Sequence, residues 1–202
     1  MSEKKVGVWL VGALGSIATT VIVGALSLGR GLVEPTGMIT ATEAFDGLGL
    51  VPLDGLEFGG CDLRQGDLRD AARHVMRETG VLSYEILDEL GEPLTGIEQD
   101  IRMGTARNCG EAIQSLAACP VSGGSTARQE IETVRIQFRD FKKKKSLDDL
   151  VVVNLASTEP PLVLHDAHLE TEAFERALDR NDPGLVKAST IYAYAAVQEG
   201  CP

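Results

Sequence analysis

Two glycines near the amino terminus, Gly12 and Gly15, could form a phosphate-binding turn. With Ala18 they follow a Gly-x-x-Gly-x-x-Ala pattern. In such a turn the first glycine permits a sharp bend, the second lets the backbone approach a phosphate, and a small third residue allows tight helix–strand packing. The N–H groups at the start of the following helix would then face the anion. A purely structural turn can carry the same pattern, so both readings stay open at this point.

Two further segments carry polar side chains where predicted strands end. Asp62 follows two glycines in FGGCD, and its carboxylate could either accept hydrogen bonds from ribose hydroxyls or begin the next helix. Ser157 and Thr158 lie in NLASTEPP, where a cofactor ring could lie flat or the chain could simply turn before proline. Ligands of parallel sheets bind at the carboxyl ends of the strands, so we expect these loops and the glycine turn to meet there.

Short apolar runs that alternate with helical patterns must position these residues. Val6–Val11 and Val151–Leu155 have the composition of fully buried strands, and 38–41 and 56–58 are candidate short strands. Spacing and stop signals predict helices from Ser16 to Leu28, Leu68 to Gly80, Leu82 to Leu90 (stopped by Gly91 and Pro93), Asn108 to before Pro120, Thr126 to Lys145, Leu169 to Leu178 and Ala188 to Gln198. This alternation predicts an α/β fold: a doubly wound, Rossmann-like, mostly parallel sheet with helices on both faces.

The charge balance excludes some partners. Thirty acidic residues against 19 basic ones give a net charge of -11, which disfavours nucleic-acid binding. The only basic run, 142–145, is interpreted as a solvated helix end, where each cation gains at best about 0.3–1 kcal/mol from the helix dipole. The apolar stretch from 6 to 28 is interrupted by glycines, so we expect no membrane span.

Four scattered cysteines without a C-x-x-C pair favour a reducing compartment. They are Cys61, Cys109, Cys119 and Cys201. No signal peptide is recognised, so we expect a cytoplasmic protein.

Taken in order, several segments resemble one family, the myo-inositol-phosphate synthases. These segments are VGALGSIATT, LVPLDGLEFGGCDLR, GIEQDIR, RDFKKKK with VVVNLASTEPP, and KASTIYAYAAVQEGCP. The resemblance covers nearly the whole chain. It implies conversion of glucose 6-phosphate to inositol 3-phosphate with NAD as cofactor, by internal oxidation, aldol cyclisation and reduction.

The same resemblance implies a set of NAD contacts. At the turn and the later strand these are Gly12, Ala13, Leu14, Gly15, Ser16, Leu155, Ala156, Ser157 and Thr158; Asp62 would contact the adenosine side, and Gln99 and Arg102 would add contacts from QDIR. Eukaryotic family members resemble Gly-x-Gly-Gly-Asn-Asn-Gly at the turn, whereas Leu14 stands here for the second glycine. We therefore expect Gly15 to approach the phosphate and Leu14 to point away from it.

The family continues beyond the equivalent of residues 200–202 into a segment that binds substrate and carries the catalytic lysines. We therefore expect residues 1–202 to form one NAD-binding domain, truncated before the catalytic and oligomerisation domain. The resemblance implies a homo-oligomer, a tetramer, for the full-length protein. Two alternatives remain: the cofactor domain of another NAD(P)-dependent dehydrogenase, or a stand-alone nucleotide-binding or interaction module.

Within the chain itself we assign no catalytic residue and no metal site. Lys187 precedes an apolar helix and is interpreted as a solvated helix start. His165 and His168 resemble a metal-binding pair, but no third ligand follows at short spacing, so a polar loop is the preferred interpretation. His74 lies among charged residues and is interpreted as a surface side chain.

Overall fold

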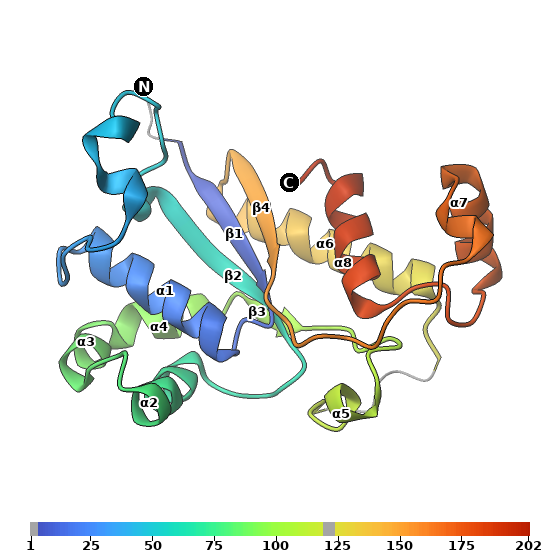
Figure 1. The fold of residues 1–202 in the computed structure, drawn as a ribbon, viewed down its shortest axis with the longest axis horizontal. Helices are drawn as coiled ribbons and strands as arrows, with labels where there is room; N and C mark the ends of the chain where they lie inside the picture. The colour runs from blue at the N-terminus through green and yellow to red at the C-terminus, as the bar shows by residue number, and fades with distance from the viewer. Residues whose placement is uncertain (1–3, 119–123) are drawn as a thin grey trace.

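Four parallel strands form one sheet in the order β3-β2-β1-β4 (Figure 1). The computed structural model describes residues 4–118 and 124–202. The strands are β1 (Val6–Val11), β2 (Leu56–Asp62), β3 (Ile101–Met103) and β4 (Asp149–Asn154). The central strand β1 pairs with β2 on one side and β4 on the other, with Val11 level with Cys61 and Asn154. The carboxyl ends of these three strands therefore lie at one edge of the sheet.

Helices cover both faces of this sheet, as the alternating pattern predicted. One face carries α1 (Ser16–Gly29), α2 (Leu68–Thr79), α3 (Tyr84–Glu89) and α4 (Gly91–Glu98), and the other carries α6 (Ala127–Lys145), α7 (Thr171–Arg180) and α8 (Ala188–Gln198). The short helix α5 (Glu111–Gln114) lies beyond the carboxyl ends of the strands (Figure 1). The predicted doubly wound α/β class is confirmed.

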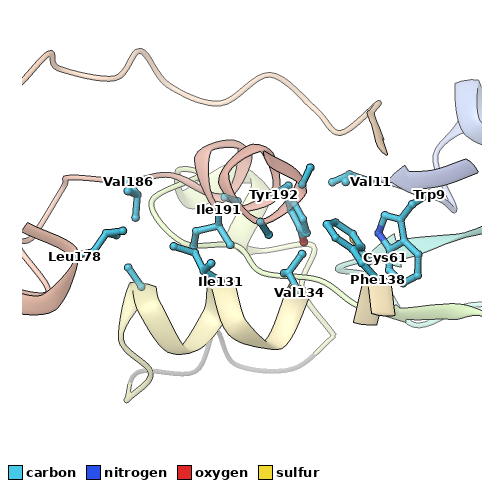
Figure 2. Packing of buried hydrophobic residues seen from close by; sticks show 14 of the residues in the cluster. Trp9, Val11, Cys61, Ile131, Val134, Phe138, Leu178, Val186, Ile191 and Tyr192 are labelled. Atoms are coloured by element: carbon cyan, nitrogen blue, oxygen red, sulfur yellow. The ribbon is translucent and has the colours of Figure 1, made fainter. Parts of the chain in front are cut away.

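Alternate side chains of β1 enter two separate hydrophobic clusters. Trp9 and Val11 point to the α6–α8 face, and Leu10 points to the α1–α4 face. The Trp9 ring meets Phe138 and Phe141 of α6 edge-on, with centroids 5.3 and 5.5 Å apart. Figure 2 shows how α6 and α8 direct their apolar side chains toward each other next to the end of β1.

The strand predicted at 56–58 is longer than expected and continues to Asp62. Gly59 and Gly60 therefore lie inside β2 rather than after it. A Cβ on Gly60 would collide with Leu10 O, and one on Gly59 would lie 2.8 Å from the Phe141 ring. Glycine is needed at these two strand positions because neighbouring groups pack directly against the strand backbone.

Two further expectations were wrong, and a third was incomplete. Residues 39–41 form a 3-10 turn instead of a strand, and they do not join the sheet. The predicted helix does end just before Gly91, since α3 stops at Glu89, but Gly91 and Pro93 also begin a second helix, α4. A proline in the first turn of a helix loses no helical hydrogen bond. β4 is an edge strand and is only partly buried, not buried on both faces.

The remaining helices differ from expectation mainly at their ends. Gly110 rather than Asn108 precedes α5, and Pro120 lies outside the described residues. α7 begins at Thr171, because Leu169 belongs to the preceding turn. The capping box of Thr126 and Gln129 at the start of α6 is confirmed.

The lysine run at the end of α6 is not simply solvated. Lys144 Nζ lies 2.5 Å from Asp100 Oδ1, and Lys145 Nζ bridges Asp100 and Glu57. Because Asp100 is 2% exposed, these two lysines neutralise a buried carboxylate. No helix in the described residues has the length and apolar character needed to cross a membrane.

Candidate functional site

A cavity of about 620 Å³ opens at the carboxyl edge of the sheet. Its walls come from the turn between β1 and α1, the ends of β2 and β4, the loop after β3, and the start of α8. This is the edge at which parallel α/β sheets bind their ligands.

The glycine turn is held tightly against the end of β2. Gly12 N and Ala13 N both donate to Cys61 O, and Gly15 N donates to Gly12 O. Within the described part of the chain, the N–H groups of Ser16, Ile17 and Ala18 have no protein acceptor, and no side chain caps α1. The first turn of α1 therefore supplies the donors for an anion, while the glycine turn shapes the backbone around it.

At both glycines of the turn a side chain would be crowded by neighbouring backbone atoms. Gly12 has φ +86°, and a Cβ there would lie 3.1 Å from Ala156 Cα. A Cβ on Gly15 would lie 3.0 Å from Gly12 O. Both glycines line the cavity. The turn thus fits the close approach of a pyrophosphate.

Asp62 ends β2 and holds the glycine turn in place. It is 7% exposed, and its Oδ2 accepts a hydrogen bond from Leu14 N at 2.9 Å. Its Oδ1 accepts from Arg64 N at 3.0 Å and Arg64 Nε at 3.1 Å, and Arg64 Nη2 reaches Oδ2 at 3.3 Å. Asp62 does not begin the next helix, because Asp67 caps α2. Its expected contact with a ribose stays a prediction, since protein donors already engage both oxygens.

The structure brings most of the expected contact residues to this cavity. Those that line it are Gly12, Gly15, Ser16, Asp62, Leu155, Ala156, Ser157 and Thr158. The segment after β4 is shaped by Asn154, whose side-chain oxygen accepts a hydrogen bond from Ala156 N. The assignment of NAD contacts to individual residues remains a prediction.

Four expected residues do not line the cavity. The side chains of Ala13 and Leu14 are buried in the α1–α4 cluster, which fits the expectation that Leu14 points away from a phosphate. Gln99 precedes β3, and Arg102 is the middle residue of this short strand, level with Cys61 of β2. Arg102 Nη1 donates to Gln99 O, and neither residue lines the cavity.

Sequence reasoning did not identify the ionic cluster that fixes the loop after β3. Arg107 Nη2 lies 2.8 Å from Glu130 Oε1, and Thr105 Oγ1 donates to Glu130 Oε2 at 2.6 Å. Burial works to raise the pKa of Glu130, but the hydrogen bonds it accepts outweigh burial and hold the pKa below its ordinary value. The cluster joins α6 to a loop that lines the cavity through Thr105 and Cys109.

Cys61 and Tyr192 form the floor of the cavity toward the α6–α8 face. The Tyr192 hydroxyl accepts a hydrogen bond from Thr105 N at 2.7 Å. Burial raises the pKa of the Cys61 thiol to about 11 and also raises the pKa of Tyr192. Both groups are therefore neutral at physiological pH and give the cavity an uncharged floor.

Lys187 is not the solvated helix start that the sequence indicated. It is 8% exposed, lines the cavity, and precedes the first residue of α8. Within the described residues its Nζ has no hydrogen-bond partner. Its neighbour Ser189 donates from both N and Oγ to Glu159, at 3.0 and 2.5 Å.

The two histidines support a local turn. His165 Nδ1 accepts from Ala167 N, and His168 Nδ1 accepts from His165 N. His168 Nε2 lies 2.8 Å from Leu185 O, so it carries the proton and donates. Across residues 4–118 and 124–202, no group of three or more His, Cys, Asp or Glu side chains is arranged to hold a metal ion.

The strand order, the glycine turn and the cavity define a Rossmann-like dinucleotide-binding unit. A family model for the NAD-binding part of proteins described as myo-inositol-1-phosphate synthase matches residues 6–202. The chain therefore belongs to the myo-inositol-1-phosphate synthase family.

Individual relatives agree with this family. The chain is 30% identical to inositol-3-phosphate synthase 1 of Bacteroides thetaiotaomicron, over 98% of this chain and 47% of that protein. It is 27% identical to inositol-3-phosphate synthase 1 of Oryza sativa subsp. japonica, over 98% of this chain and 43% of that protein. The chain thus spans less than half the length of these relatives.

A solved structure supports the fold. The crystal structure of inositol-3-phosphate synthase from Caenorhabditis elegans matches with a TM-score of 0.76 and 18% identity, over 99% of this chain and 43% of that chain. At this identity, the match concerns the fold alone.

Proposed function

We propose that this chain binds NAD at the carboxyl edge of its sheet, as the cofactor-binding part of an inositol-3-phosphate synthase. The observation that carries the proposal is the combination of a tight glycine turn with three N–H groups at the start of α1 that find no acceptor in the described residues. An anion placed there meets aligned donors and the positive end of a 14-residue helix. Membership of the family supports NAD as the source of that anion.

The residues divide the work of binding. Gly12 and Gly15 keep the backbone free of side chains where the pyrophosphate would lie. Asp62 fixes the turn through Leu14 N, and Ser157 and Thr158 provide hydroxyl groups at the end of β4. When bound, NAD would supply reversible hydride transfer to and from the substrate. The uncharged floor formed by Cys61 and Tyr192 keeps thiolate and phenolate charge away from that reaction.

The proposed activity of the whole enzyme is conversion of glucose 6-phosphate to inositol 3-phosphate. Ring closure through an enolate needs a cationic group beside the reacting oxygen and a proton shuttle. We propose that these groups come largely from a catalytic and oligomerisation domain outside the 202 residues, in a homotetramer located in the cytoplasm. The net charge of -11 supports a protein without nucleic-acid partners.

Calorimetric titration of the chain with NAD and with NADP tests the binding proposal. We expect NAD to bind more tightly, because the Arg64 fork is engaged by Asp62 and that carboxylate would repel a 2′-phosphate. Tighter binding of NADP, or no binding of either dinucleotide, would contradict the proposal.

A companion assay measures release of inositol phosphate from glucose 6-phosphate and NAD by the 202-residue chain, beside a full-length relative. We expect no turnover by the chain. Turnover near the rate of the full-length relative would place the catalytic groups within these residues instead.

A further inference from the structure

The Lys187 amine is a buried cation that has no partner among the described residues. Its Nζ is buried without a hydrogen-bond acceptor, whereas the buried carboxylates have cations beside them: Asp100 has Lys144 and Lys145, and Asp62 has Arg64. A buried charge is costly unless it is paired. The position of Lys187 therefore calls for an anion that the described chain does not provide.

The surroundings of Lys187 give that anion a place. The residue lines the 620 Å³ cavity and an adjoining one of about 580 Å³, although its Nζ atom is itself buried. Ser157 and Thr158 line the same cavity and have exposed hydroxyl-bearing side chains. Two carboxylates line the same cavity and both already have partners: Glu159 accepts hydrogen bonds from Ser189 at both oxygens, and Asp62 accepts from Arg64.

A cavity lined by a lysine and by hydroxyl groups is suited to a phosphate, which lysine binds as a point charge. Two sources of phosphate are chemically possible, a dinucleotide and a sugar phosphate. The first turn of α1 already provides donors for a pyrophosphate, and Lys187 belongs to a different element, the start of α8. This division favours the sugar phosphate for Lys187.

We propose that Lys187 binds the phosphate group of a sugar phosphate in this cavity, separately from the dinucleotide at α1. The choice of sugar phosphate rests on the proposed function; the need for an anion rests on the buried amine alone. In this proposal the cofactor-binding part of the enzyme supplies one cation, Lys187, for binding the sugar phosphate.

The test compares the parent chain with Lys187→Met, which keeps the length of the side chain but removes its charge. Lys5→Met is the matched control, because Lys5 is exposed at the start of β1, at the opposite end of that strand from the cavity. Each protein is titrated by calorimetry with glucose 6-phosphate, glucose and NAD, and its thermal midpoint is measured without ligand.

We expect glucose 6-phosphate, but not glucose, to bind the parent, and Lys187→Met to weaken that binding at least tenfold with NAD affinity unchanged within about twofold. The ligand-free midpoint should rise in Lys187→Met, because an unpaired buried charge is removed. Lys5→Met should match the parent in all three titrations.

Three results would overturn the inference: no binding of glucose 6-phosphate by the parent, equal binding by Lys187→Met, or a loss confined to NAD. The NAD titration of the parent separates this inference from the proposed function. If the parent binds NAD, and Lys187→Met binds glucose 6-phosphate as tightly as the parent does, only the inference fails. If NAD does not bind but the phosphate effect of Lys187 persists, only the proposed function fails.

Discussion

Asp62 Oδ2 accepts a hydrogen bond from the backbone N–H of Leu14 at 2.9 Å, so the end of β2 holds the turn that begins α1. The carboxylate also receives three donors of Arg64. Leu14 and Asp62 are both largely buried, so this carboxylate holds the cofactor turn together with Cys61 O, which accepts hydrogen bonds from Gly12 N and Ala13 N.

Asp62→Asn should therefore weaken NAD binding about tenfold and lower the free energy of unfolding by about 1.5–3 kcal/mol, the range for hydrogen bonds to charged groups. The asparagine amide has only one acceptor oxygen, and its NH₂ group would face N–H donors of Leu14 or Arg64 that now bind the carboxylate. The measurements are NAD calorimetry and urea denaturation. Asp67→Asn is the control and should be nearly neutral, because asparagine caps a helix as well as aspartate does. NAD affinity equal to that of the parent would contradict this role for Asp62.

Leu14 stands where the family has glycine, which from the sequence alone suggests that a smaller residue would be accepted. In the structure it is 7% exposed within the α1–α4 cluster. We therefore expect Leu14→Ala to lower the free energy of unfolding by about 2–5 kcal/mol, as buried leucine truncations do. Urea denaturation measures this. A loss below 1 kcal/mol would show that the Leu14 side chain is not packed as described.

Glu130 should make the protein more stable at neutral pH than in acid. Its pKa is held below the ordinary value of 4.5 in the folded chain, so its contribution is complete above that value and is lost as the pH falls through the lowered pKa. Glu130→Gln should lower the free energy of unfolding by about 1–3 kcal/mol at pH 7. This difference from the parent should shrink progressively below pH 4.5.

Urea denaturation of both proteins across this pH range provides the measurement. Glu34→Gln is the control, because Glu34 is exposed and should show no such dependence. A difference between parent and Glu130→Gln that stays constant in acid would rule out the depressed pKa as its cause.

The sequence predicted the parts of the fold that local patterns encode. β1, the turn, α1 and α8 follow from apolar runs and helix signals, and the capping box located the start of α6. The extension of β2 through Gly59 and Gly60 was missed, because glycine is a turn signal unless a distant group such as Leu10 O packs on it. Whether glycines belong to a strand or to a turn is decided in such cases by strands that are distant in the sequence, here β1.

The location of the candidate site could be predicted from the sequence, but the side-chain contacts within it could not. Strand ends marked the loops that meet at the cavity, since topology places them together. The burial of Lys187 depends on the β4 loop passing beside the start of α8, which no local pattern reveals. The contact of Arg64 with Asp62 was missed although the sequence carries a signal for it, a basic residue two positions after an acidic one.

The central claim is that the glycine turn and the first turn of α1 bind NAD, and calorimetric titration of Gly15→Val with NAD tests it most directly. The added side chain would fill the space beside Gly12 O at the cavity wall, so we expect binding to be lost while the far-ultraviolet circular dichroism stays that of the parent. Gly24→Ala is the control. A Cβ at Gly24 meets nothing within 4 Å, and this helix-interior change should retain NAD binding and add about 0.5–1 kcal/mol of stability. NAD affinity in a folded Gly15→Val equal to that of the parent would contradict the account.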